Sequence, residues 1–398
     1  MKNGHWLNAT RLRVYPRILL ILYLSIGAGA LLYWWFAGAG ATQRIVSDLL
    51  VFWIAATFSV SGHPALAYDP AQIHHAMAHW APQIEGDYGW FYPPTFLLMV
   101  TPMGWTSYGV AFFTFMGISL TGYVAALRKV MPDHRFLWGV ATFPGIWINV
   151  LTGQNGLLTA ALTGLALQVL ESNPVLSGVL IGLLSIKPHL ALLFPVALVA
   201  LRAWKTLWVA LLTGVACFGV SAWVLGPDTF AAWLHSLDIA RAIMQAGGTG
   251  PMMPTAFAFM RLLKFPVVLA YGVQAVVGTW AVLLLWQVCR SGACFPLKAA
   301  ALMTASLLVS PYLFEYDLAW LGFPIAWMTK CALEEQRWLF MEREILLLAW
   351  WLPLMTVVLA WLLHLQPGPW IVGLLLWIIA RRALSMHHSQ VHDLECVP

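Results

Sequence analysis

Ionisable side chains beside apolar segments are the first candidates for chemistry in this sequence. Asp48 directly precedes the apolar run 49–53, and Lys187 lies with His189 between two other apolar runs. A carboxylate with hydrophobic neighbours has a raised pKa and is a plausible proton acceptor. A lysine at membrane depth, close in sequence to a histidine, suits an anionic partner such as a phosphate. The alternatives are an N-cap role for Asp48 and a Lys187 ammonium that extends to lipid headgroups.

Further polar residues occur in short turns between apolar runs. Gln154 and Asn155 stand between two glycines, in a turn whose amides could also donate hydrogen bonds. Glu315 and Asp317 follow Ser310-Pro311. Their spacing could hold a divalent cation or a sugar, or both carboxylates could simply be solvated.

Two other groups resemble metal ligands only by their spacing. Glu85 and Asp87 repeat the pattern of alternate carboxylates, and His75 and His79 are four residues apart. That histidine spacing can bind a metal on a helix, but no Cys or nearby carboxylate completes a tight site. We expect a short surface helix at residues 74–79 and predict no metal site.

The composition identifies the class of protein that must position these residues. Of 398 residues, 61% are hydrophobic and 9% are charged, against about 45–50% and about 25% in soluble domains. This excludes a soluble globule or a disordered chain, and no basic polar face exists for nucleic acid. The five cysteines imply no disulfide framework, because none lies in a long polar loop. The sequence predicts an all-α polytopic membrane protein.

Apolar runs divided by charged residues predict about twelve membrane helices in one domain, residues 1–398. A first periplasmic loop with interfacial helices covers residues 43–93, and a second covers 226–264. Pro102 and Gly104 should break the run 95–127 into a re-entrant part and a crossing helix. The other expected spans are residues 18–36, 137–151, 156–170, 176–185, 191–201, 207–225, 266–288, 297–310, 318–328, 345–364 and 370–380.

The distribution of basic residues predicts the orientation. If both termini are cytoplasmic, 16 of the 21 Lys and Arg residues fall in cytoplasmic segments, as the positive-inside rule requires. The outer five are Arg44, Lys187, Arg241, Arg261 and Lys264. The expected location is a bacterial inner membrane, with the candidate site facing the periplasm.

The order of the short motifs resembles glycosyltransferase family 87. The motifs are Ser47-Asp48, Tyr92-Pro93-Pro94, Gly153-Gln154-Asn155, Lys187-Pro188 and Ser310-Pro311. The resemblance covers about residues 44–317. It implies a GT-C type helical bundle and an enzyme that uses a polyprenyl-phosphate sugar, without a metal or other cofactor.

The resemblance also implies roles for individual residues. Asp48 would be the general base for an inverting transfer of a hexose, with mannose as one candidate, to a hydroxyl of an envelope acceptor. Lys187 and His189 would bind the donor phosphate. The residues implied in substrate binding are Arg44, Tyr92, Gln154, Asn155, Tyr312, Glu315 and Asp317. The partners would be the lipid-linked donor, a lipid or glycan acceptor and membrane lipids.

Two alternatives belong to other functional classes. A membrane transporter or lipid flippase would have charges along a midplane route and an internal repeat, and the sequence shows no repeat. A structural subunit of an envelope-assembly complex would tolerate the loss of both Asp48 and Lys187.

Overall fold

The computed structural model describes residue 6 and residues 9–36, 48–80, 89–134, 136–246 and 250–395. The chain is helical throughout, and no strand occurs in these ranges. The first half forms α1 (Ala9–Phe36), α2 (Leu49–Val60), η1 (Pro64–Tyr68), α3 (Pro70–Trp80), α4 (Pro94–Val100), η2 (Thr101–Trp105), α5 (Tyr108–Val130), α6 (Phe136–Ala141), α7 (Pro144–Thr152), α8 (Gly156–Val169), α9 (Pro174–Gly182), η3 (Leu183–Ile186) and α10 (Pro188–Ala191). The second half forms α11 (Phe194–Ala200), α12 (Trp204–Leu225), α13 (Pro227–Ala246), η4 (Gly250–Met252), α14 (Ala256–Leu262), α15 (Val267–Arg290), α16 (Phe295–Val309), η5 (Glu315–Leu321), α17 (Gly322–Glu334), α18 (Glu342–Leu363) and α19 (Gly368–Glu395).

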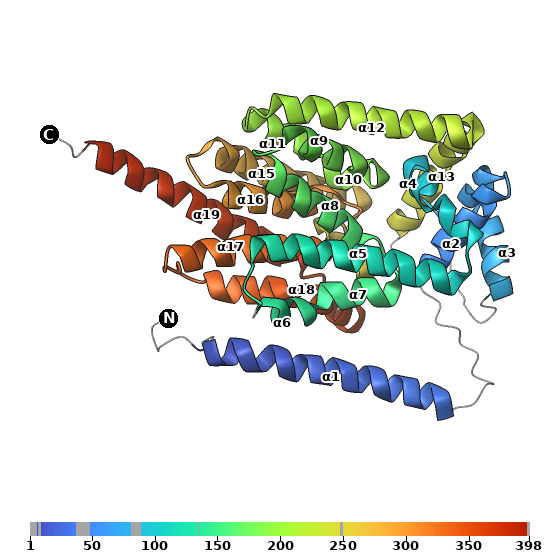
Figure 1. Ribbon diagram of the computed structural model, residues 1–398, viewed down its shortest axis with the longest axis horizontal. Helices are drawn as coiled ribbons and strands as arrows, with labels where there is room; N and C mark the ends of the chain where they lie inside the picture. The colour runs from blue at the N-terminus through green and yellow to red at the C-terminus, as the bar shows by residue number, and fades with distance from the viewer. Residues whose placement is uncertain are drawn as a thin grey trace.

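Three pairs of short helices carry the chain into the bundle and back. The turn 153–155 joins α7 to α8, the segment 183–193 joins α9 to α11, and the segment 310–321 joins α16 to α17. The longest of these helices, α16, has 15 residues and is about 22 Å long, whereas a membrane crossing needs about 20 residues. Figure 1 shows α5 and α12 continuing past the ends of these pairs. The three connections therefore lie inside the bundle, short of the ends of α5 and α12 that extend toward α2 and α3.

A layer of helices covers the part of the bundle in which these three connections lie. Figure 1 shows α2, α3, α4 and α13 grouped at the end of the bundle toward which α5 and α12 extend. Residues 49–56 of α2 are all buried, and the Phe52 ring lies 5.2 Å from the Phe96 ring and 5.6 Å from the Trp90 ring. The indole of Trp53 donates to the backbone carbonyl of Thr106 at 2.9 Å. This apolar packing fixes the start of α2, where Asp48 lies.

The expected break at Pro102 and Gly104 is confirmed. The helix α4 ends at Val100, the 3-10 helix η2 follows, and α5 starts at Tyr108. The expected single span 137–151 is instead divided into α6 and α7. Pro144 explains this division, because a residue before proline avoids helical dihedrals and Phe143 is extended.

Six of the described helices are long and apolar enough to cross a membrane by length and composition. They begin at residues 10, 108, 204, 267, 342 and 368. Five further apolar helices have 10–17 residues. The chain is therefore a helical membrane protein, and the count of twelve crossings stays a prediction.

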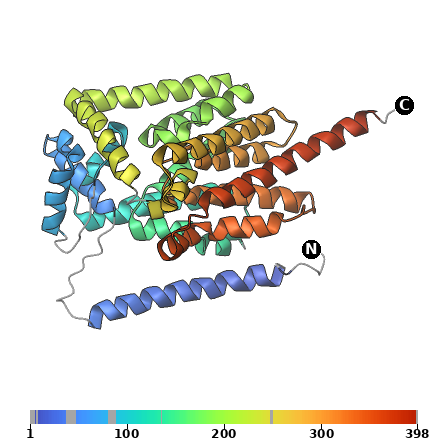
Figure 2. The ribbon, with the colours of Figure 1, turned by 180° about the vertical axis from the view of Figure 1, so that it is seen from behind.

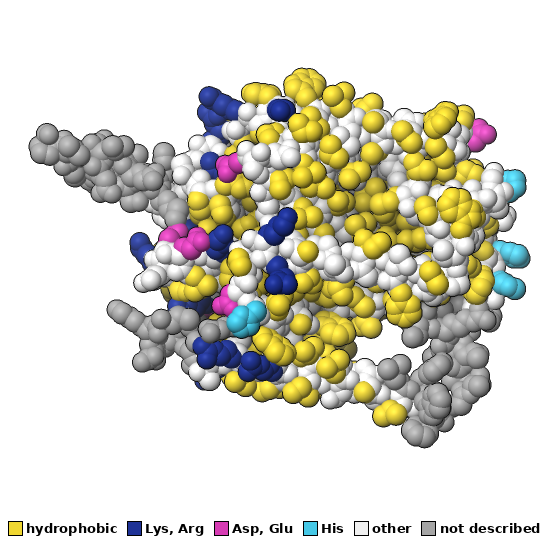
Figure 3. Space-filling model, in the orientation of Figure 1, with side chains coloured by type: hydrophobic (Ala, Val, Ile, Leu, Met, Phe, Trp, Pro, Cys, Tyr) yellow, Lys and Arg dark blue, Asp and Glu magenta, His cyan; other side chains and the backbone are white. Residues whose placement is uncertain are grey.

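Basic residues mark one end of the long axis. Figure 3 shows Lys and Arg gathered at the end where α5 finishes and α17 turns into α18, and most of the visible His side chains at the opposite end. The helix α1 lies beside the bundle in both views (Figures 1 and 2). Among the described residues of α1, Tyr23 contacts the Trp147 ring at 5.7 Å and Arg17 lies over the Trp138 ring at 5.1 Å.

Candidate active site

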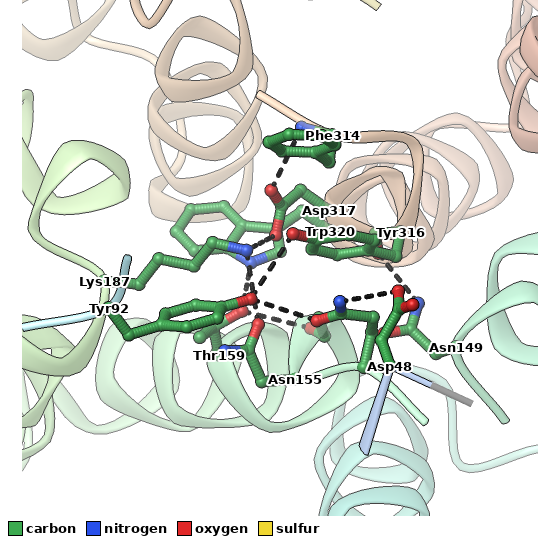
Figure 4. A network of polar contacts seen from close by, with 12 residues as sticks. Asp48, Tyr92, Asn149, Asn155, Thr159, Lys187, Phe314, Tyr316, Asp317 and Trp320 are labelled. Carbon is green, nitrogen blue, oxygen red and sulfur yellow. Dashed lines mark hydrogen bonds and ion pairs between the residues drawn. The ribbon is translucent and has the colours of Figure 1, made fainter. Parts of the chain in front are cut away.

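A partly buried chain of hydrogen bonds starts at Asp48 (Figure 4). Gln154 Nε2 donates to Asp48 Oδ2 at 2.9 Å, and the Tyr92 hydroxyl donates to Gln154 Oε1 at 3.0 Å. The Tyr92 and Tyr316 hydroxyls lie 3.3 Å apart. Asp48 stands at the N-cap position of α2, as the structural alternative expects, but its side chain makes no cap hydrogen bond. Gln154 holds Oδ2 and leaves Oδ1 of the carboxylate as the oxygen available to take a proton.

Lys187 lies at the centre of the second half of the network. Its Nζ atom donates to Asp317 Oδ1 at 2.6 Å and to Asn155 Oδ1 at 3.2 Å. The same ammonium lies 4.4 Å from the centre of the Tyr316 ring. Lys187 is 3% exposed and Asp317 is fully buried, which rules out an ammonium extended to the headgroups. An ammonium has three N–H donors, so one remains for a ligand.

The local sequence places these groups through two close backbone approaches. Gly153 ends α7 with φ 69°, a left-handed conformation that a residue without Cβ adopts at little cost. A Cβ on Gly156 would lie 2.2 Å from the Tyr316 carbonyl oxygen, so only glycine lets α8 approach η5. Asn149 Nδ2 donates to that same carbonyl at 2.7 Å. The turn with Gln154 and Asn155 is thereby held against the segment with Asp317.

Burial controls the charges of the acidic groups. Desolvation raises the pKa of Asp48, and the hydrogen bond from Gln154 opposes this. Burial also raises the pKa of Asp317, while Lys187 lowers it. Glu315 reaches a pKa of about 8 through burial, with repulsion from Asp48 and Asp317 in the same direction. Glu315 is therefore largely protonated at neutral pH, which limits the negative charge of the site.

Several buried polar atoms around Lys187 have no partner among the residues that the structure describes. They are Asn155 Nδ2, His189 Nε2, Glu315 Oε2 and Ser185 Oγ, the last from the residue two positions before Lys187. An unpaired buried polar group is costly, and a native structure tolerates such groups where a ligand or water satisfies them. The arrangement has a carboxylate at one end, a cation at the other, and unpaired groups beside the cation. Asp48 can therefore take a proton from one ligand while Lys187 holds an anionic group of a second ligand.

The structure brings together most of the residues singled out in the sequence. They form two hydrogen-bonded groups, Asp48 with Gln154 and Tyr92, and Lys187 with Asn155 and Asp317. Tyr316 joins the two groups into one network. Glu315 and His189 adjoin it through their electrostatic interactions with Asp48 and Lys187, respectively. Arg44, Glu85 and Asp87 lie outside the described residues.

Tyr312 belongs to a different contact set. Its hydroxyl bonds to that of Tyr271, and its ring lies 6.2 Å from that of Phe257. The histidines of α3 lie on its exposed side, as expected for a surface helix: His74, His75 and His79. No group of three or more His, Cys, Asp or Glu side chains able to hold a metal occurs in the ranges described.

Sequence reasoning did not single out Tyr316 and Asn149. Tyr316 stands between the two carboxylates of the Glu-Tyr-Asp segment, which was a usable signal. Asn149 lies four residues before Gly153 inside an apolar helix, where a buried amide requires a partner.

The comparisons with known proteins bear on this site. Residues 90–311, more than half of the chain, match the family model described as glycosyltransferase family 87. No curated protein and no solved structure matches the chain. The matched range contains Tyr92, the Gly153–Gly156 turn and Lys187. The chain belongs to glycosyltransferase family 87.

Proposed function

We propose that this glycosyltransferase moves a hexose from a polyprenyl-phosphate donor to a hydroxyl of an envelope acceptor on the periplasmic side. The observation that carries the proposal is one network that connects Asp48 to Lys187 through Gln154, Tyr92 and Tyr316. A group that takes a proton and a cation that faces an anionic leaving group are the two requirements of this reaction.

The proposed step is a direct displacement at the anomeric carbon. The acceptor oxygen forms a bond to that carbon while its proton passes to Asp48. The bond between the carbon and the phosphate oxygen breaks on the opposite face, and its electrons remain on the polyprenyl phosphate. Lys187 stabilises that phosphate with its third N–H, and His189 Nε2 and Ser185 Oγ are the unpaired groups beside it. The step inverts the anomeric configuration and needs no metal or other cofactor.

The depth of the site supports a lipid-linked donor. The short helix pairs end below the outer ends of α5 and α12 (Figure 1), so the network lies at a level that a lipid phosphate can reach. The basic end of the bundle (Figure 3) supports a cytoplasmic position for that end. The network would then open toward the periplasm of a bacterial inner membrane.

The test is sugar transfer by the purified full chain in lipid nanodiscs. A panel of polyprenyl-phosphate hexoses, including the mannose form, is combined with glycolipid and glycan acceptors. We expect Asp48→Asn to lower kcat by about 10²–10⁴-fold while donor binding is kept. Asp228→Asn, an exposed carboxylate on α13, is the matched control and should act like wild type.

Two outcomes contradict the proposal at different levels. Turnover by Asp48→Asn within a few-fold of wild type would remove Asp48 as the base and leave the enzyme class intact. Movement of the donor across vesicle membranes without any glycoside product would favour the transporter alternative.

A further inference from the structure

A second polar cluster lies apart from the Asp48–Lys187 network, at the outer end of α15. The hydroxyls of Tyr271 and Tyr312 bond to each other, and Gln245 Nε2 donates to Tyr271 at 3.3 Å. The Phe257 ring lies 4.6 Å from the Tyr271 ring, and Arg241 lies near the Tyr312 hydroxyl, where its positive charge acts to lower the pKa of that group. We call these five residues the outer tyrosine cluster.

The cluster is built rigidly but stays accessible. Phe257 is buried, Tyr271, Tyr312 and Gln245 are half-buried, and Arg241 is exposed. Arg261 fixes the backbone beneath it by donating to the carbonyl oxygens of Gln245 and Phe265, both at 2.8 Å. The result is an aromatic surface surrounded by two hydroxyls, an amide and a guanidinium. These groups donate and accept hydrogen bonds in several directions, and the rings offer flat apolar area.

The charge distribution singles out the same place. Of the five basic residues assigned to the outer side, Arg241 and Arg261 belong to or support this cluster, and Lys264 follows the end of α14. Outer cations are few under the positive-inside rule. Arg261 is occupied by backbone carbonyls, whereas the described ion pair of Arg241 is a 3.4 Å contact with the exposed Asp238. An exposed pair of this kind is weak, so Arg241 can turn to a ligand.

The cluster is joined to the reaction site by one residue. Phe314 packs against the apolar side of the cluster, and its ring stacks on Tyr316 at 5.5 Å with an interplanar angle of 2°. Tyr316 in turn contacts Lys187 and Tyr92. A molecule seated on the cluster therefore adjoins the network that holds Asp48. This is the position required for the part of an acceptor that lies beyond its reacting hydroxyl.

We propose that the outer tyrosine cluster binds sugar rings of the acceptor, so the acceptor of this enzyme is a glycan. The inference rests on the proposed function and specifies its acceptor. The Tyr312 ring stacks on the apolar face of a sugar, while Gln245 and the two hydroxyls bond its hydroxyl groups. Arg241 serves a hydroxyl or a carboxylate of the same ring.

Saturation-transfer NMR on the full chain in nanodiscs tests this directly. The probes are methyl α-D-glucoside and methyl α-D-glucuronide, which distinguish neutral from acidic sugars. Tyr312→Ala should weaken binding of both probes by about tenfold, the loss expected for roughly 1.4 kcal/mol. Tyr312→Phe keeps the ring and should lose less. Arg241→Gln should weaken only the glucuronide if the acceptor is acidic, and both probes alike if it is neutral.

The controls separate this inference from the proposed transfer reaction. Asp238→Asn, one turn from Arg241 on α13, should bind both probes like wild type. Lys187→Met should lose donor binding and keep probe binding. A failed donor assay therefore does not prevent a conclusion about the glycan site. Equal probe binding by wild type and Tyr312→Ala, or no binding by wild type, would overturn the glycan site. Competition by a Ser/Thr peptide and not by the glycosides would also overturn it, in favour of a protein acceptor.

Discussion

Among the described residues, two buried ion-pair clusters have similar chemistry and different surroundings. Near the basic end of the bundle, Arg382 donates to Glu342 Oε1 at 2.9 Å and Oε2 at 2.6 Å. It also donates to Glu335 and to the Arg337 carbonyl. In the candidate site, Lys187 pairs with Asp317 at 2.6 Å. The cations and Glu342 and Asp317 are almost completely buried in both places.

The difference lies in the unpaired groups. Every guanidinium nitrogen of Arg382 donates to a described acceptor, and Glu342 Oε2 accepts from the Leu339 amide at 2.9 Å. Around Lys187, by contrast, Ser185 Oγ and His189 Nε2 are buried without a described partner. A saturated cluster holds helices together, whereas an unsaturated one has capacity for a ligand. We infer that Arg382 serves the fold and Lys187 serves the reaction.

Replacing Arg382 should destabilise the folded protein, and this is the largest effect that we expect. Arg382→Met leaves Glu342 and Glu335 without their shared cation, which should cost about 3–5 kcal/mol of stability. Thermal unfolding in nanodiscs measures the loss. The transfer rate per folded molecule should be unchanged. A stable Arg382→Met with a low specific activity would contradict the assignment.

Replacing Lys187 should have the opposite signature. Lys187→Met should lower kcat/KM for the lipid-linked donor by about 100-fold, because it removes the cation that faces the leaving phosphate. Its unfolding temperature should fall less than that of Arg382→Met, since Asp317, whose pKa is already raised by burial, can take up a proton. Transfer assays and thermal unfolding on the same samples check both parts. Normal donor kinetics with a large stability loss would make the two clusters equivalent.

Glu315 should make donor binding at the Lys187 cluster depend on pH, and this is the smallest effect that we expect. Because its pKa is about 8, it is neutral below that pH and gains a negative charge above it. The KM for the anionic donor should therefore rise several-fold as pH passes from about 7 to about 9. Glu315→Gln should abolish this rise, and the acid limb due to Asp48 should remain. A pH series of kcat/KM for both proteins provides the measurement. An alkaline limb that persists in Glu315→Gln would exclude Glu315 as its source.

Local patterns in the sequence predict the class of protein, one helix break and the family. Composition predicts a helical membrane protein, and Pro102 and Gly104 mark the break before α5. The motif order identified the family that the comparison confirms. These features succeed because hydropathy and proline stereochemistry act within a few residues of the chain.

Partners of the site residues, by contrast, were decided by the tertiary structure. Asp48 meets Gln154 across 106 residues, and Lys187 meets Asp317 across 130. The sequence predicts a proton acceptor or an N-cap at Asp48 and a phosphate-binding cation at Lys187, each by itself, and contains no signal that pairs Lys187 with Asp317. The family resemblance implies a substrate-binding role for Tyr312, yet its side chain turns away from the Asp48–Lys187 network to Tyr271.

The sequence by itself determined that this chain is helical, that it belongs in a membrane and which residue types could do chemistry. Tertiary packing decided which of those residues share a site, and the approach of α8 to η5, which Gly156 permits, is one part of that packing. The physical reason is that hydropathy and helix breaks are properties of neighbouring residues. A buried ion pair forms only where helices that are distant in the sequence pack together and exclude water.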